Sequence, residues 1–462
     1  MLFSTPIFLF AFLPLVWIIN RLLKTGLSNV FLCVASLFFY AWGEPVYVLL
    51  MVASSGLNWL FARGMPASKH KKTRLILALV CNLAILAVFK YAGFAAQTLN
   101  ALMGLRLPDP GIALPIGISF FTFQAMSYVV DAYKEKTAPQ RSFLKVLLYI
   151  SFFPQMVAGP IVKYHEISEQ IEHRTVTAEQ TARGIRRFCI GLAKKVLIAN
   201  TLSVTVDAIH ALPASQLSLP LAWIAALAYI LQLYHDFSGY SDMAIGLGVM
   251  FGFRFPENFN YPLVSRSVRE FWTRWHISLS SWFRDYLYIP LGGNRKGQLR
   301  TGVNKVIVFF LTGLWHGAQW TFVVWGLIHG FFMLVEQYLF PRGMGKRLRF
   351  LPWLYTSLVV VLSFVLFRAE SFSQALALWG NMFAGGLRLG MQSKLLTPLL
   401  YAAGLAGCIG CLPLVPALQK KLHGKLATAA SAASYAAAFG LLVLCVLALA
   451  SGTHNPFIYL RF

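Results

Sequence analysis

The stretch VNKVIVFFLTGLWHGAQWTFVVWGLIHGFFMLVEQYLF, residues 303–340, decides the fold. Its only charged residues are Lys305 and Glu336, so it suits a hydrocarbon environment rather than water. Because a helix crosses the hydrocarbon core of a bilayer with about 20 apolar residues, the stretch is long enough for a hairpin of two membrane helices. Two histidines, His316 and His329, would then lie inside the membrane.

Similar apolar runs recur on both sides of this stretch. The runs at 30–60 and 219–253 are also long enough for hairpins, which brings the expected total to about 11–13 membrane helices. We therefore predict an all-α, polytopic membrane protein whose residues 1–462 form a single membrane domain. The remaining runs of spanning length lie at residues 6–20, 75–96, 114–130, 143–162, 196–212, 353–367, 395–415 and 427–450.

The charge distribution also fits a membrane protein. The formal net charge of +24 could suggest a nucleic-acid partner, but the basic residues form short clusters between apolar runs. We therefore expect contact with membrane lipid and no nucleic-acid partner. The clusters at 21–24, 63–74, 342–349 and 420–425 belong in the cytoplasm by the positive-inside rule. The topology of 145–217 stays open.

The segment 254–305 is neither a span nor an ordinary loop. Positions 265–305 hold eight Lys and Arg but only two Asp and Glu, interleaved with aromatic residues. On a helical wheel the aromatic residues fall on one arc of about 120°, beside a polar stripe. This pattern predicts an amphipathic or re-entrant helix at the cytoplasmic face, with its aromatic residues at headgroup level. The arc holds Phe271, Trp272, Trp275, Leu279, Trp282, Phe283 and Tyr286, and the stripe holds Arg269, Thr273, His276, Ser280 and Arg284.

His316 is the strongest candidate for chemistry, because polar groups within membrane helices are costly and point to function. If its helix begins near Val303 at the cytoplasmic face, His316 lies about 20 Å into a core roughly 30 Å thick. Gly313 and Gly317 allow the backbone to break there, or another helix to approach closely. A neutral imidazole could take a proton from a hydroxyl that attacks a thioester. The alternative is a purely structural hydrogen bond between helices.

Two other histidines are weaker candidates. Helix packing is favoured for His329, because Trp325 lies four residues earlier on the same helix face. His235 stands next to Asp236, but adjacent helical residues point about 100° apart, which disfavours a catalytic dyad. The sequence has no HExxH, Walker, GxSxG or GxGxxG motif, so we expect no metal and no bound cofactor. A secondary transporter stays open on topology alone.

The run ENFNYPLVSRSVREFWTRWHISLSSWFRDYLYIPLGGN at 257–294 and the run LTGLWHG at 311–317 resemble the membrane-bound O-acyltransferase family. The likeness is strongest to the bacterial branch that O-acetylates alginate or peptidoglycan outside the cell. It extends to LPIGISFFTFQAMSYVVD at 114–131, FFPQMVAGPI at 152–161, FSGYSDMAIGLG at 237–248, LFRAE at 366–370 and the terminal PFIYLRF, so it covers nearly the whole chain.

This resemblance implies roles for individual residues. The family's essential intramembrane histidine corresponds to His316 and its second histidine to His276, which makes both expected catalytic residues. The donor is expected to be an acyl thioester from the cytoplasm, and the acceptor a hydroxyl reached from the other side. Arg269, Arg274 and Arg284 would then suit the phosphates of coenzyme A, with anchoring to anionic lipid headgroups as the alternative. A departure is His235, where relatives carry an aromatic residue.

The expected function is therefore that of a multi-pass acetyltransferase of the bacterial inner membrane. It would take acetyl from cytoplasmic acetyl-CoA and pass it across the membrane for O-acetylation of an extracytoplasmic polysaccharide, such as alginate or peptidoglycan. We expect a partner O-acetyltransferase outside the cytoplasm to complete the transfer. Two alternatives stay open, namely D-alanyl transfer to teichoic acid from a carrier protein and a transport or export subunit without chemistry of its own.

Overall fold

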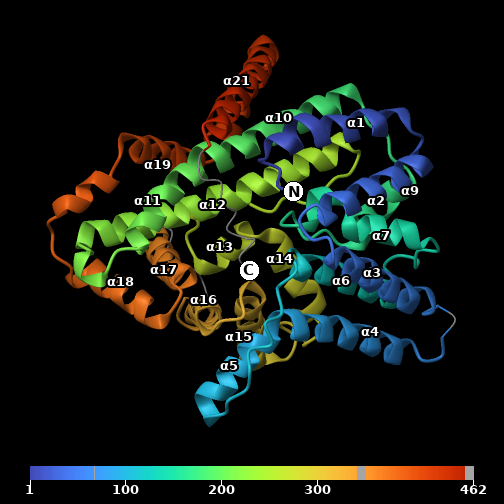
Figure 1. Cartoon of the computed structure of the whole chain (residues 1–462), viewed down its shortest axis with the longest axis horizontal. Coiled ribbons are helices and arrows are strands. Elements are labelled where there is room, and N and C mark those ends of the chain that lie inside the picture. The colour runs from blue at the N-terminus through green and yellow to red at the C-terminus, as the bar shows by residue number, and fades with distance from the viewer. Residues whose placement is uncertain (67, 341–349, 453–462) are drawn as a thin grey trace. The chain divides into compact units, whose positions relative to one another are not determined.

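The computed structural model describes residues 1–66, 68–340 and 350–452, and every regular element within them is a helix (Figure 1). The all-α prediction is therefore confirmed. Two expectations cannot be followed further, because the basic loop 342–349 and the terminal PFIYLRF lie outside the described residues.

The chain divides into two compact units. Unit 1 comprises residues 1–188 and 243–256, and unit 2 comprises residues 189–242 and 257–462. Helices α10 (Ala178–Ala193) and α12 (Leu219–Met250) contribute residues to both units. A single membrane domain over the whole chain stays a prediction.

Unit 1 is held together by polar as well as apolar contacts. Asn58 on α3 and Asn82 on α4 are fully buried and exchange two side-chain hydrogen bonds of 2.7 and 3.2 Å. Such pairing satisfies polar groups that no water can reach. The elements wholly within unit 1 are η1 (Phe8–Phe12), α1 (Leu13–Leu22), α2 (Thr25–Ala41), α3 (Tyr47–Arg63), α4 (Lys71–Leu86), η2 (Ala87–Tyr91), α5 (Ala92–Met103), α6 (Ile118–Tyr133), α7 (Phe143–Ser151), α8 (Phe153–Met156) and α9 (Tyr164–Glu172).

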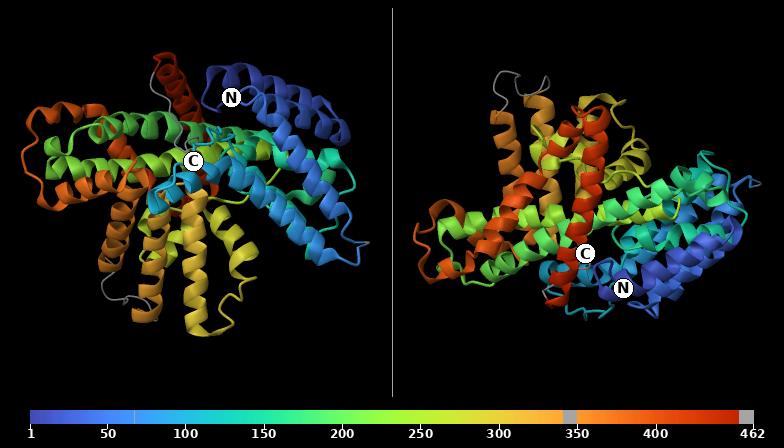
Figure 2. Two further views of the ribbon diagram at one scale, coloured as in Figure 1. Left: turned by 60° about the horizontal axis from the view of Figure 1, so that its bottom comes forward. Right: turned by 90° about the horizontal axis from the view of Figure 1, so that it is seen from above.

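Unit 2 contains the segments that the sequence singles out for chemistry. Helices α15, α16 and α17 run side by side in it, in the yellow-to-orange part of the chain (Figure 2). The elements wholly within unit 2 are η3 (Lys194–Ala199), α11 (Asn200–His210), η4 (Ala214–Gln216), η5 (Pro262–Val264), α13 (Val268–Arg274), α14 (Ile277–Phe283), η6 (Arg284–Tyr288), α15 (Gly297–His316), α16 (Trp320–Leu339), α17 (Phe350–Arg368), α18 (Phe372–Ala384), η7 (Gly390–Leu395), α19 (Pro398–Gly410), α20 (Leu414–Gln419) and α21 (Gly424–Ala450).

Several helices are long and apolar enough to cross a membrane, which agrees with a multi-pass membrane protein. Among the described residues, five helical segments meet this requirement by length and composition. The expected total of about 11–13 spans stays a prediction, because shorter and more polar helices need other criteria. The five segments are Lys71–Met103, Ala178–His210, Trp320–Leu339, Phe350–Arg368 and Gly424–Ala450, and shorter apolar helices lie at Phe8–Leu22, Thr25–Ala41 and Pro398–Gly410.

The three expected hairpins have different outcomes. Residues 30–60 form α2 and α3, and residues 303–340 form α15 and α16, as predicted. The prediction for 219–253 is wrong, because α12 is one continuous helix through residue 250. Its glycines do not open a turn. A Cβ added at Gly239 would lie 2.7 Å from the carbonyl oxygen of Gly191, so this glycine permits close helix contact instead.

The predicted continuous amphipathic helix at the start of 265–305 is also wrong. The backbone forms two short helices, α13 and α14, that are interrupted at Trp275 and His276. His276 has φ 45° and ψ 53°, a left-handed conformation that ends any continuous helix. The aromatic residues pack into unit 2, where Phe271 and Trp275 are almost completely inaccessible and Tyr286 is half-buried. Their position at headgroup level stays a prediction.

Candidate active site

The structure brings His276 and His316 together. Their ring centroids are 6.3 Å apart with an angle of 81° between the ring planes, and both side chains are buried. The two residues come from different elements, since His276 lies at the break between α13 and α14 and His316 is the last residue of α15. Two imidazoles at this separation can act on one small group placed between them.

The position of His316 depends on two glycines. A Cβ added at Gly313 would lie 2.4 Å from the carbonyl oxygen of Phe322, so only glycine lets α16 approach α15 this closely. Gly317 follows His316 with extended backbone and ends the helix. Both alternatives that the sequence left open therefore occur, a break in the backbone and a close helix contact.

A backbone hydrogen bond sets the tautomer of His316. Its Nδ1 lies 2.8 Å from the carbonyl oxygen of Thr312. A carbonyl oxygen can only accept, so Nδ1 carries the proton and Nε2 is the basic nitrogen of the neutral ring. The ring is surrounded by aromatic side chains, with centroid distances of 5.0 Å to Trp315, 4.9 Å to Trp325 and 5.5 Å to Phe367.

His276 is held by a residue that sequence reasoning missed. Its Nδ1 lies 3.1 Å from Oδ1 of Asn258, which is fully buried. Phe237 packs edge-on against the His276 ring, with centroids 4.7 Å apart. Asn258 lies within the quoted run 257–294, but no spacing rule connects it with a histidine eighteen residues later.

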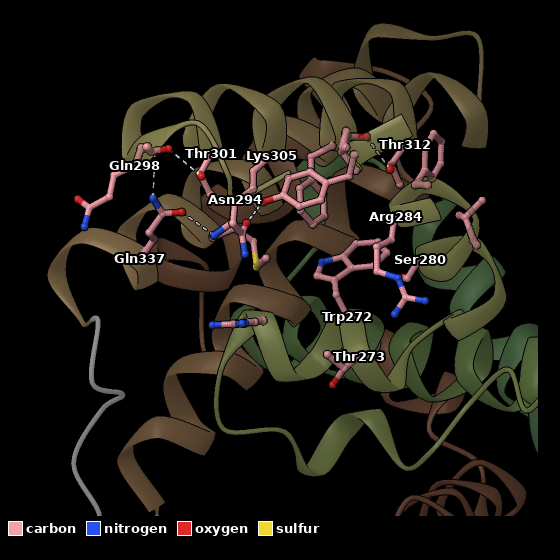
Figure 3. Close-up of a pocket in the computed structure, with 18 residues that line it drawn as sticks. Trp272, Thr273, Ser280, Arg284, Asn294, Gln298, Thr301, Lys305, Thr312 and Gln337 are labelled. Carbon is pink, nitrogen blue, oxygen red and sulfur yellow. Dashed lines mark hydrogen bonds between the residues drawn. The ribbon is translucent and has the colours of Figure 1, made fainter. Parts of the chain in front are cut away.

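A cavity of about 600 Å³ lies along α15 as far as Thr312, one helical turn before His316 (Figure 3). Thr301, Lys305 and Thr312 line it from α15, and the carbonyl oxygen of Thr312 is the acceptor for His316. Its apolar walls include Trp272 and Phe309. The other lining residues are Arg269, Thr273, Leu279, Ser280, Phe283, Arg284, Tyr288, Asn294, Gly297, Gln298, Val308, Met333 and Gln337.

The cavity is positively charged. Arg269, Arg284 and Lys305 line it, and none of its lining residues is acidic. Asp285 accepts a hydrogen bond of 2.8 Å from Arg284 Nε, and this contact raises the pKa of Arg284 above its usual value. The guanidinium therefore stays charged. Lys305 could have been found in the sequence, because it is the one basic residue of the apolar run and shares a helix face with Thr312 and His316.

Arg274 does not join the other two arginines. It forms an ion pair of 2.9 Å with Glu270 and donates a hydrogen bond of 3.0 Å to the carbonyl oxygen of Asn260. Residues five positions apart on a helix point about 140° away from each other, so Arg269 and Arg274 cannot share one face of α13. Of the predicted polar stripe, Arg269, Thr273, Ser280 and Arg284 line the cavity.

The other two histidines have separate partners. His329 Nε2 lies 3.0 Å from Ser363 Oγ, and its ring packs against Trp325 at 5.1 Å. His235 Nε2 lies 3.0 Å from the carbonyl oxygen of Gly407. Asp236 instead forms a buried ion pair of 2.8 Å with Lys195, so neighbouring His235 and Asp236 do not form a dyad. No cluster of three or more metal-ligating side chains occurs among the described residues.

Comparison with known proteins identifies the relatives of the chain. Residues 67–379 match the membrane-bound O-acyltransferase family. The chain is 42% identical to a probable alginate O-acetylase of Azotobacter vinelandii, over 84% of this chain and 79% of that protein. It is 37% identical to a peptidoglycan O-acetyltransferase of Helicobacter pylori, over 85% and 82% of the two chains. A teichoic acid D-alanyltransferase of Bacillus subtilis is 31% identical over 54% and 65%. The chain belongs to the membrane-bound O-acyltransferase family and is an O-acyltransferase.

Proposed function

We propose that the protein is an O-acetyltransferase of the bacterial inner membrane that passes acetyl from cytoplasmic acetyl-CoA to an extracytoplasmic polysaccharide. The observation that carries the proposal is the buried pair His276 and His316, together with a cationic cavity that reaches Thr312, one helical turn before His316. The pair supplies basic nitrogens, and the cavity supplies a site for an anionic donor. The relatives that act on alginate and on peptidoglycan support a polysaccharide acceptor.

The proposed chemistry uses His316 as a general base. Its Nε2 takes the proton of a hydroxyl while the hydroxyl oxygen bonds to the carbonyl carbon of the acetyl thioester. The carbon–sulfur bond then breaks, and the proton returns from Nε2 to the sulfur. The products are an acetyl ester and coenzyme A with a free thiol. His276 Nε2 can accept a hydrogen bond or a proton at the same place.

The cavity supports acetyl-CoA as the donor. Guanidinium groups pair with two phosphate oxygens at once, which suits Arg269 and Arg284 to the phosphates of coenzyme A. Lys305 adds a third cation among apolar walls that suit the pantetheine arm. Anchoring of the arginines to lipid headgroups would not require a cavity that runs along α15 towards His316.

A partner transferase is part of the proposal, because His316 is too buried to meet a polymer directly. Its side chain is only 1% exposed. A small hydroxyl-bearing group, on a partner protein or another carrier, would receive the acetyl group first. The partner would then set which polysaccharide is modified.

The test compares a deletion strain complemented with the wild type, His316→Ala or His423→Ala. His423 is an exposed histidine outside the site and serves as the matched control. The measurement is mass spectrometry of acetate esters, D-alanyl esters and total polymer in the cell envelope. Loss of acetate esters in His316→Ala alone, at equal protein level, is the expected result.

Three other outcomes would contradict the proposal. Normal acetate esters in the His316→Ala strain would remove its catalytic role. Loss of D-alanyl esters instead of acetate esters would indicate teichoic acid modification. Unchanged esters with less exported polymer in the deletion strain would indicate an export subunit.

A further inference from the structure

We infer that Asn258 is a positioning residue that fixes the tautomer and the orientation of His276. The inference rests on the proposed function, in which His276 works beside His316. Asn258 would then set which nitrogen of His276 faces the reacting group.

The hydrogen bonds around Asn258 define which amide atom meets His276. The backbone N–H and the hydroxyl of Ser278 lie 3.2 and 2.9 Å from Asn258 Oδ1, and Asn258 Nδ2 donates to Ser241 Oγ at 3.0 Å. A backbone N–H can only donate, so the atom that it contacts is the oxygen. His276 Nδ1, 3.1 Å from the same oxygen, must therefore donate as well.

This contact gives His276 the same tautomer as His316. Nδ1 of His276 is protonated towards Asn258, and Nδ1 of His316 is protonated towards Thr312. In each neutral ring Nε2 then carries the lone pair. Without the Asn258 acceptor, the His276 ring could move its proton to Nε2 and present a donor where the proposed reaction needs a base.

Asn258 also stabilises the unusual backbone at His276. Its carbonyl oxygen accepts a hydrogen bond of 2.9 Å from the N–H of Ile277, directly after the left-handed residue. On the other side of His276, the Asn260 N–H donates a hydrogen bond of 2.9 Å to the carbonyl oxygen of Arg274. A positive φ is unfavourable for histidine, so these bonds on either side keep the ring in place.

The neutral amide differs in its effect from a carboxylate. Among the described residues, Phe237, Trp315 and Ser278 contact the His276 ring, and His316 is a titratable neighbour. An aspartate at 258 would keep the acceptor but would stabilise the protonated ring. Asparagine therefore orients His276 without holding it as a cation.

The test uses inverted membrane vesicles from the native cells, with labelled acetyl-CoA outside and label in the polysaccharide as the readout. Asn258→Leu should lower kcat by about 10- to 100-fold and leave the KM for acetyl-CoA within about twofold, since it disturbs orientation but not the donor cavity. Asn58→Leu, which removes another fully buried amide, should lower thermal stability and leave kcat per folded protein unchanged.

A double variant with His276→Gln tests whether Asn258 acts by positioning His276 or by supporting the fold in general. If Asn258 acts through His276, adding Asn258→Leu to His276→Gln should cost no further activity. A further loss in the double variant as large as that in Asn258→Leu alone would overturn the inference.

The pH profile gives an independent readout. Asn258→Asp should retain activity at high pH, with the rise of kcat shifted to higher pH because the carboxylate favours protonated His276. An Asn258→Asp profile with the wild-type midpoint, or one as inactive as Asn258→Leu at every pH, would also overturn it. Wild-type vesicles that transfer no label would instead contradict the proposed function.

Discussion

Lys305 and Gln337 meet across the hairpin of α15 and α16, where Lys305 Nζ donates a hydrogen bond of 2.6 Å to Gln337 Oε1 (Figure 3). Both residues line the cavity, so a charged ammonium lies on its wall with a neutral partner. Gln337 is neutral, so this hydrogen bond does not cancel the attraction of the ammonium for an anionic ligand. The Glu336 carboxylate also interacts with Lys305 but does not line the cavity.

We expect Lys305→Gln to raise the KM for acetyl-CoA about tenfold or more, because a hydrogen bond to a charged group contributes about 1.5–3 kcal/mol. The kcat should change little, since the reacting thioester lies at the His316 end. Initial rates in vesicles over a range of acetyl-CoA concentrations measure both constants. Lys420→Gln, at an exposed position outside the cavity, is the control. An unchanged KM in Lys305→Gln would show that the donor does not use this cavity wall.

Substitutions of the arginines should affect the KM for acetyl-CoA only where the arginine lines the cavity. Arg269→Ala should raise the KM for acetyl-CoA about tenfold, because its guanidinium lines the cavity. Arg274→Ala should leave that KM unchanged, because Arg274 does not line the cavity. The same rate measurement distinguishes them. Equal effects of both variants would favour anchoring to lipid headgroups over donor binding.

These residues also show what the sequence could predict. Long apolar runs predict membrane helices because the bilayer requires a fixed length, and the hairpin at 303–340 and the burial of His316 follow from that alone. Gly313 and Gly317 predict a break in the backbone or a close contact between helices, because few other roles suit glycine inside an apolar helix. The spacing of seven and eleven residues also places Lys305 on the helix face of Thr312 and His316.

The break at His276 could not be predicted from local pattern. The aromatic periodicity of 271–286 belongs to the sequence, so it is the same whether the helix continues or breaks. The deciding bonds come from Asn258 and Asn260, which precede the segment. For α12, a long apolar run with several glycines is compatible with either a hairpin or one continuous helix. The role of Gly239 is a close contact with Gly191 in another helix, which local sequence does not reveal.

Gly313→Ala should displace His316. The added Cβ would lie 2.4 Å from the carbonyl oxygen of Phe322, so α15 and α16 must separate. A shift of about 1 Å at a reacting group can cost about 100-fold in rate, and we expect a loss of that order together with a lower Tm. Gly380→Ala on α18 meets nothing within 4 Å and should keep full activity. Wild-type rates in Gly313→Ala would mean that the close helix contact is not needed for catalysis.

Trp325 should restrict the size of the acyl group. Its ring lies 4.9 Å from that of His316 and is fully buried. We therefore expect it to occupy the space into which a longer acyl chain would extend. Truncation to Ala would open a volume for additional methylenes, each of which contributes about 0.8 kcal/mol when buried. We therefore expect Trp325→Ala to raise the ratio of butyryl to acetyl transfer by about tenfold.

Competition between labelled acetyl-CoA and butyryl-CoA in the same vesicles measures this ratio directly, independent of the amount of folded protein. Trp353→Ala on α17, where the ring is partly exposed, should leave the ratio unchanged. Phe367→Ala removes a second aromatic side chain next to His316, with centroids 5.5 Å apart, and should shift the ratio in the same direction. An unchanged ratio in both Trp325→Ala and Phe367→Ala would show that the aromatic residues around His316 orient its ring without selecting the acyl group.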